Sequence, residues 1–171
     1  MYGSVEEIGD GRWRLRFTRD LAHPVERVWR AITEPEHLAA WFPTTIDGER
    51  APGAKLGFTF PNDMAPPFEG EVIAYQPPRL FEFRWGPDVI RLEVQPSERG
   101  TLLTLLDTLD ERGKAARDAA GWHVCLDALS AELAGDQRAR ERMSAWNDVH
   151  PHYVDEFGPE AATIGPPEGT P

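Results

Sequence analysis

The feature that most constrains the fold is a long amphipathic segment from Gly113 to Gly135, GKAARDAAGWHVCLDALSAELAG. Its apolar residues recur at alternating steps of four and three, which places them along one side of an α-helix. Asp110 is suited to cap this helix, and Gly135 is suited to the left-handed position after its last turn. Because nearly everything before the helix reads as short strands, we expect a sheet that packs onto its apolar side. The residues of that side are Ala115, Ala119, Trp122, Leu126, Leu129 and Leu133.

The region before the helix predicts one strand, two short helices and then a series of antiparallel strands. Residues 12–20 alternate apolar and polar side chains, whereas 25–33 and 35–42 carry apolar residues at helical spacing. The segment 61–70, PNDMAPPFEG, is too rich in proline for a tight hairpin and predicts a loop that could act as a lid. Turns rich in glycine and proline separate further strands predicted at 44–46, 55–60, 68–75, 79–85, 89–95 and 101–108.

Composition limits the partners that the protein is expected to bind. The net charge of −11 argues against nucleic acid and anionic membranes, because both would repel most of the surface. No apolar run approaches the roughly 20 residues that cross a bilayer, and the first residues lack the regions of a signal peptide. The single cysteine, Cys125, cannot form an internal disulfide, which fits a reducing compartment. We therefore expect a cytoplasmic protein with no nucleic-acid or membrane partner.

Four motifs occur in the order that is typical of a helix-grip fold. They are PEHLAAWF at 35–42, FEGEVIAYQPPRLFEFRW at 68–85, GTLLTLLD at 100–107 and GWHVCLDALSAELAG at 121–135. With these motifs the chain resembles the activator of heat-shock-protein-90 ATPase homologue-like family. That family lies within the START-like (SRPBCC) superfamily, which includes polyketide cyclases and pollen-allergen-like ligand carriers.

The resemblance covers residues 12–135 and implies an α+β helix-grip domain. In such a domain a curved antiparallel sheet wraps around the long C-terminal helix, with an apolar cavity between them. Residues 136–157 predict a helical C-terminal appendage, because they keep a weaker helical stripe. Residues 158–171 have little apolar content and predict a disordered tail.

The aromatic residues predict that this cavity takes an apolar or aromatic molecule. Rigid rings are too numerous to pack around one helix without gaps, although an ordinary aromatic core is the alternative. We expect the loop 61–70 and the short helix around Trp41 and Phe42 to control access. The candidate ligand-binding residues are Trp29, Trp41, Phe42, Phe58, Phe60, Phe83, Trp85, Leu105, Asp107, Trp122, His123 and Leu126.

Three positions, Asp107, His123 and Gly121, concern the polar groups and the space of this cavity. Asp107 shares its strand parity with Leu105, so its carboxylate is expected to point inward, where burial raises the pKa unless a partner opposes it. His123 is the expected partner, either as an acid–base pair or with both residues simply solvated. Gly121 lies inside the long helix, where glycine lowers helix stability by about 1 kcal/mol relative to alanine. Either a neighbouring backbone or ring packs closely there, or the missing side chain leaves room for a ligand beside Trp122.

The sequence leaves three functions open. The first is binding of a small apolar or aromatic molecule. The second is a polyketide-cyclase-like enzyme in which Asp107, His123 or Tyr75 handles protons in the same cavity. The third is a chaperone-linked or self-associating protein, such as a homodimer, that acts through the C-terminal appendage.

No metal and no cofactor are predicted. His150 and His152 lie near two aspartates, but the proline between them gives no fixed ligand geometry. A glycine-rich phosphate loop and a nucleophile elbow are both missing from the sequence.

Overall fold

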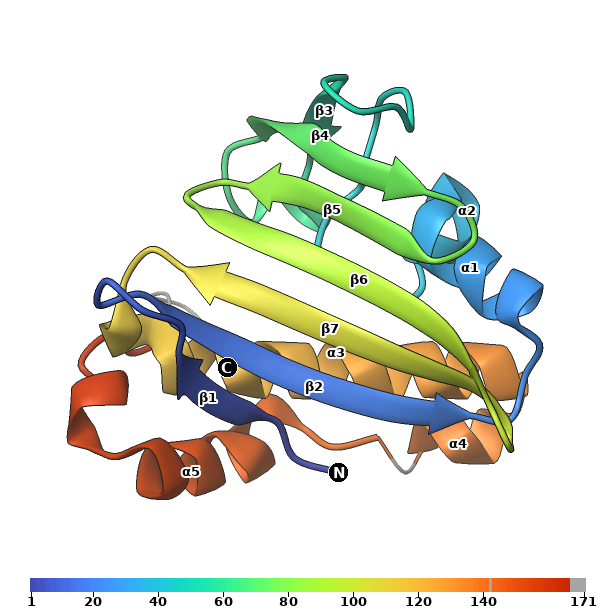
Figure 1. Cartoon of the computed structure of the whole chain (residues 1–171). Helices are drawn as coiled ribbons and strands as arrows, with labels where there is room; N and C mark the ends of the chain where they lie inside the picture. Colours follow the sequence, from blue (N-terminus) through green and yellow to red (C-terminus); the bar gives the residue numbers. More distant parts are fainter. Residues whose placement is uncertain (142, 167–171) are drawn as a thin grey trace.

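Seven strands form an antiparallel sheet of order β1-β2-β7-β6-β5-β4-β3 (Figure 1). Successive side chains of each strand point to opposite faces of this sheet. The structure is a computed structural model, and it describes residues 1–141 and 143–166. One strand, β1, was not predicted, and it pairs with β2 at the sheet edge through the turn at 9–11. The strands are β1 (Ser4–Glu7), β2 (Trp13–Leu21), β3 (Lys55–Phe58), β4 (Phe68–Gln76), β5 (Leu80–Trp85), β6 (Asp88–Ser97) and β7 (Gly100–Leu109).

The long helix α3 (Ala115–Ala134) lies behind the sheet along β2 and β7, as Figure 1 shows. Two short helices, α1 (Val25–Thr33) and α2 (Pro35–Leu38), follow β2. This arrangement confirms the predicted α+β helix-grip fold. Short 3₁₀ turns lie at η1 (Pro61–Asp63) and η2 (Arg112–Lys114).

The predicted C-terminal end of α3 agrees with the structure, whereas its predicted N-cap does not. Gly135 ends the helix with φ of 63°, in the left-handed conformation expected of it. The predicted N-cap at Asp110 is wrong, because η2 separates that residue from the first turn of α3. The carboxylate of Asp110 instead accepts a hydrogen bond from the Lys114 ammonium, 2.5 Å away.

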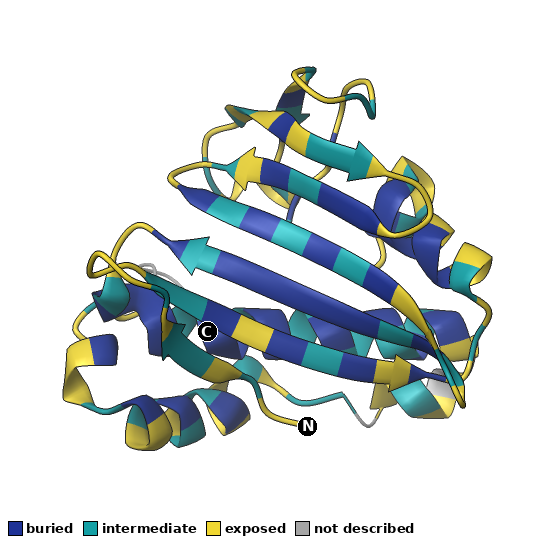
Figure 2. Ribbon diagram, viewed as in Figure 1, coloured by how far each residue is buried: buried dark blue, intermediate teal, exposed yellow. Residues whose placement is uncertain are grey.

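Burial alternates along β2 and β6, whereas residues 103–107 of β7 are all buried, and one face of the sheet forms the core with α3 (Figure 2). In the centre β2 pairs with β7, so that Phe17 lies opposite Leu105 and Leu15 lies opposite Asp107. The strand predicted at 44–46 is wrong. Thr45 donates one backbone hydrogen bond to the carbonyl of Thr59, just past β3, and an isolated bridge between Asp47 and Gly57 follows the segment.

Gly70 in β4 lies where the chain leaves no space for a side chain. A Cβ at this position would lie 2.1 Å from the carbonyl oxygen of Arg84, which belongs to the backbone of β5 and cannot move aside. We expect Gly70→Ala to lower the free energy of unfolding in urea by about 1–3 kcal/mol. Gly57→Ala on the neighbouring strand is the control, because a Cβ there meets nothing within 4 Å. Equal changes for the two variants would contradict this packing.

The C-terminal extension packs against α3 as two helices, α4 (Gln137–Glu141) and α5 (Trp146–Phe157). Tyr153 of α5 is fully buried, and its hydroxyl accepts a hydrogen bond from the Gly3 amide at 3.0 Å. The expected disordered tail differs from what the structure shows for 158–166. There a 3₁₀ turn, η3 (Pro159–Ala161), buries Ala161, and the amide of Ile164 bonds the carbonyl of Gly113. Residues 167–171 lie outside the described residues.

Candidate functional site

An open pocket of about 590 Å³ lies beside the first turns of α3. Its wall combines the β5–β6 turn, the aromatic residues that flank the loop 61–67, and Trp146 at the start of α5. Aromatic and other apolar groups make up most of this wall, and a charged cluster forms one end. The lining residues are Pro43, Phe60, Phe68, Trp85, Gly86, Pro87, Asp88, Lys114, Arg117, Asp118, Gly121, Trp122 and Trp146.

The absence of a side chain at Gly121 leaves part of this pocket free. A Cβ at Gly121 would meet nothing within 4 Å, so close packing against a backbone or ring does not explain the glycine. The residue lies in the helical wall beside Trp122, and both line the pocket. Of the two explanations drawn from the sequence, the geometry therefore favours the one in which the missing side chain leaves space.

The charged end of the pocket is built around a buried ion pair between β6 and the start of α3. The Lys114 ammonium donates to both carboxylate oxygens of Asp88, each at 2.7 Å, and also pairs with Asp110. Burial raises the pKa of Asp88, and the hydrogen bonds from Lys114 and from the Asp110 amide oppose that rise. Burial lowers the pKa of Lys114, but the hydrogen bonds to Asp110 and Asp88 outweigh burial and raise it. The hydrogen bonds between the two side chains thus favour the charged form of each.

Asp107 lies behind the pocket wall and is fully buried. Its Oδ2 accepts a hydrogen bond from the indole N–H of Trp122 at 2.7 Å, whereas Oδ1 has no hydrogen-bond partner among the described residues. Burial and the nearby charge of Asp88 raise the pKa of Asp107 well above its ordinary value, although the bond from Trp122 lowers it. The carboxyl group therefore keeps its proton at pH values where an exposed aspartate has lost it.

The predicted site residues fall into three groups. Phe60, Trp85 and Trp122 line the pocket. The rest of the apolar set belongs to the buried core, in which the ring of Phe42 lies 5.6 Å from that of Trp122 and 6.0 Å from that of Phe83. The residues of this core group are Trp29, Trp41, Phe42, Phe58, Phe83, Leu105 and Leu126.

Asp107 and His123 form the third group, and they do not pair with each other. His123 lies on the side of α3 that faces α5, where its Nδ1 is 2.8 Å from the Tyr153 hydroxyl. Burial and the charge of Arg19 lower the pKa of His123, which Asp127 opposes. One residue along the helix, Trp122 points to Asp107 instead, because successive helical residues differ by about 100° in direction.

Comparison with known families decides the identity of the fold. The sequence model described as "Activator of Hsp90 ATPase homolog 1-like protein" matches residues 22–134. The chain belongs to this family. Comparison with curated protein sequences gave no significant match.

Solved structures show that the likeness extends past the part matched by the model of the Activator of Hsp90 ATPase homolog 1-like family. A conserved protein of unknown function from Enterococcus faecalis has a TM-score of 0.75 at 18% identity, covering 91% of this chain and 90% of its own. CalU16 from Micromonospora echinospora has a TM-score of 0.65 at 23% identity, covering 86% and 96%. A protein from Bordetella parapertussis has a TM-score of 0.65 at 22% identity, covering 89% of this chain and 87% of its own. These likenesses concern the fold.

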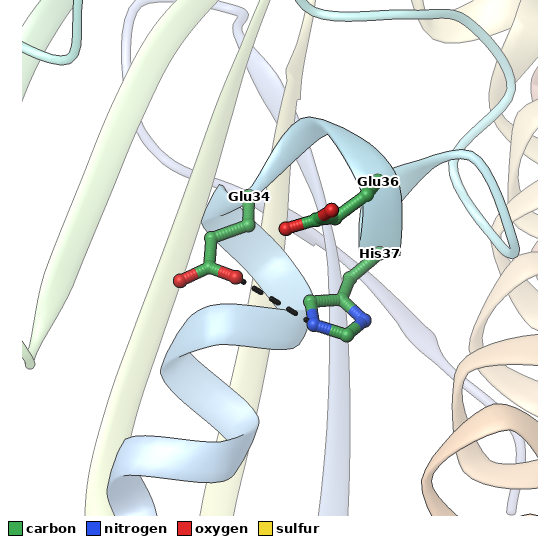
Figure 3. Close-up of side chains that lie close together, drawn as sticks. All are labelled: Glu34, Glu36 and His37. Atoms are coloured by element: carbon green, nitrogen blue, oxygen red, sulfur yellow. Dashed lines mark ion pairs between the residues drawn. The ribbon is translucent and has the colours of Figure 1, made fainter.

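Within the Activator of Hsp90 ATPase homolog 1-like domain, two groups of side chains could hold a metal ion among the described residues. One is Asp88, Asp107 and Asp118 at the pocket. The other is Glu34, Glu36 and His37, which surround the turn between α1 and α2 (Figure 3). In the second group Glu34 and His37 form an ion pair at 3.6 Å across one helical turn, which accounts for their approach.

Sequence reasoning missed most of the polar part of the pocket. Asp110, Lys114 and Asp118 are spaced four apart, and that spacing signals ion pairs along one side of a helical turn. Asp88 gave no such signal, because it reaches Lys114 only when the sheet packs on α3. Trp146 lies outside the region matched by the Activator of Hsp90 ATPase homolog 1-like model, so the extension supplies part of the pocket wall.

Among the described residues, none of the helices is both long and apolar enough to cross a membrane.

Proposed function

We propose that the chain binds a small apolar or aromatic molecule in the pocket beside Gly121. The observation that carries this proposal is the open space over Gly121 between aromatic side chains. A pocket of about 590 Å³ is in the range of small-molecule sites, which are mostly apolar and contain a few placed polar groups. Burying an apolar molecule there would release roughly 25 cal/mol for each Å² of apolar surface removed from water.

The charged end of the pocket would orient the ligand. Asp88 and Lys114 are held rigidly by one another, so their hydrogen-bonding directions are fixed before the ligand arrives. A ligand that offers one polar group at this end and an apolar body at the other would satisfy both parts of the wall. The loop predicted over 61–70 covers only 61–67, because β4 begins at Phe68. This loop, in which Asn62 and Asp63 adopt positive φ, is the proposed lid.

A matched pair of substitutions at Gly121 tests the proposal. Gly121→Phe should fill the pocket and lower the affinity for 1-naphthylmethanol at least tenfold in isothermal titration calorimetry. Gly121→Ala should keep the affinity. Because alanine is the better helix former, it should also raise the free energy of unfolding by about 0.5–1 kcal/mol. Equal binding by the phenylalanine variant and the wild type would place the ligand elsewhere, and no binding to the wild type would contradict the proposal.

The polyketide-cyclase-like alternative uses the same pocket and depends on Asp107. A carboxyl whose pKa burial raises well above its ordinary value is the kind of group that general acid catalysis requires. Its full burial argues against direct contact with a substrate, and ligand binding is therefore the function we favour. The cytoplasmic location and the homodimer expected from the sequence stay predictions.

A further inference from the structure

The charged end of the pocket has two carboxylates, Asp88 and Asp118, and two cations, Lys114 and Arg117, in its wall, with the carboxyl groups of Asp107 and Asp110 next to them. Lys114 directs its ammonium protons at both oxygens of Asp88 and at Asp110, so the carboxylates already engage its donors. Arg117 directs its Nε at Asp118, 2.6 Å away. The two cations that line the pocket are thus committed to carboxylates.

Asp107 adds a third carboxyl directly behind Asp88 and Asp118. One oxygen from each of the three lies within 4.8 Å of the others. The Oδ1 atom of Asp107 is buried and has no hydrogen-bond partner among the described residues, and such an atom costs about 1–3 kcal/mol in a folded protein. In a native protein each such atom calls for an explanation, and contact with a ligand's charge beside the pocket is one. This atom is an observation independent of the acidic cluster itself.

The walls next to these carboxylates are aromatic. Trp85 and Trp122 lie with ring centroids 5.5 Å apart, and both line the pocket together with Trp146. The faces of aromatic rings attract cations, and tryptophan does so most strongly. The net charge of −11 further favours the approach of cations over anions.

We propose that the pocket takes a protonated amine with an apolar or aromatic body. The ammonium group would lie against Asp88 and Asp118, and Asp107 behind them would release its proton when the amine binds. This inference rests on the proposed function and narrows its ligand class. In the ligand-free protein the two outer carboxylates oppose ionisation of Asp107, and an added positive charge reverses that effect.

Few other groups face Asp107. On the sheet its neighbours are apolar, since Leu15 lies opposite on β2 and Ile90 opposite on β6. From the helix side the indole N–H of Trp122 bonds its Oδ2, and the charge of Lys114 favours ionisation. Lys114 is present with and without ligand, so only the charge of a bound cation would shift Asp107 from its protonated to its ionised form.

The ligand class can be tested with three naphthalene compounds of the same shape and different charge. We expect 1-naphthylmethylamine to bind at least tenfold more tightly than 1-naphthylmethanol at pH 7, and 1-naphthoate to bind most weakly. Binding of the alcohol or the naphthoate as tightly as the amine would overturn the amine proposal and leave the proposed function standing. Failure of all three compounds to bind would overturn both.

The role of Asp107 can be tested by calorimetry in two buffers of different ionisation enthalpy, phosphate and Tris. The wild type should release protons when the amine binds, and its affinity should rise with pH through the titration of Asp107. Asp107→Asn should abolish the release, whereas Asp155→Asn, at an exposed position of α5, should retain it. Equal heats in the two buffers for the wild type would overturn this part of the proposal. Binding of Mg²⁺ or Ca²⁺ alone, lost in Asp107→Asn and not displaced by the amine, would overturn the proposal in favour of a metal site.

Discussion

Replacing Lys114 by methionine is expected to lower the free energy of unfolding by about 3–5 kcal/mol at pH 7. Lys114 donates to both oxygens of Asp88, and the two side chains are 9% and 5% exposed. Without the ammonium, the Asp88 carboxylate would be a buried charge that keeps only the hydrogen bond from the Asp110 amide. Urea unfolding at pH 7 measures the loss.

The loss should depend on pH and on Asp88. Without Lys114 the pKa of Asp88 in the folded protein rises further above its ordinary value, so stability falls as pH rises through that window. The variant should therefore approach the wild type in acid, where Asp88 is protonated. Combining Lys114→Met with Asp88→Asn should recover much of the loss, because no buried charge then lacks a partner.

Lys55→Met on the exposed edge of β3 is the control, and it should stay within about 0.5 kcal/mol of the wild type. Equal stability of the Lys114 and Lys55 variants would show that the Asp88 pair does not form.

The second large effect concerns Asp107. Asparagine keeps an oxygen for the indole N–H of Trp122 but cannot ionise. In the wild type, burial raises the pKa of Asp107 in the folded protein, so between its ordinary and its raised pKa only the folded state holds the proton. The free energy of unfolding then falls with rising pH by about 1.4 kcal/mol per pH unit.

Asp107→Asn should remove this slope, so that the variant gains stability relative to the wild type as pH increases. Unfolding curves measured at intervals between pH 4 and pH 9 would show it. Asp110 serves as a control of opposite sign, because the hydrogen bond from Lys114 lowers its pKa. In the wild type, the stability contributed by the ionised carboxylate of Asp110 is lost as pH falls through the pKa of Asp110. Asp110→Asn should lack this decrease in the free energy of unfolding. Parallel pH profiles for the wild type and Asp107→Asn would mean that Asp107 is ionised in the folded protein.

The fold could be predicted because its main signals are local. The spacing of apolar residues along 113–135 defined α3, and alternation defined six of the seven strands to within two residues. The edge strand β1 was missed because four residues with two glutamates carry little alternation, and its pairing depends on the turn before β2. The strand at 44–46 was wrong, because β propensity alone does not secure a partner.

The candidate site could be predicted only in its aromatic half. Strand parity correctly placed Asp107 inside, but the choice between His123 and Trp122 as its neighbour depends on the rotation of α3 against the sheet. Asp88 and Lys114 are distant in sequence and meet only in the packed domain. The pocket is also displaced from the centre of the sheet toward the start of α3. Side chains fill the core at the centre of the sheet, whereas the missing side chain of Gly121 leaves space near the start of α3.

Native mass spectrometry of the protein purified from its natural cells would show whether the pocket beside Gly121 holds a small molecule. We expect a small-molecule adduct that is lost on denaturation and is missing from Gly121→Phe purified in the same way. The mass of the adduct would also give the ligand class. An adduct-free protein that runs as a dimer would contradict the account and would favour self-association through the C-terminal extension.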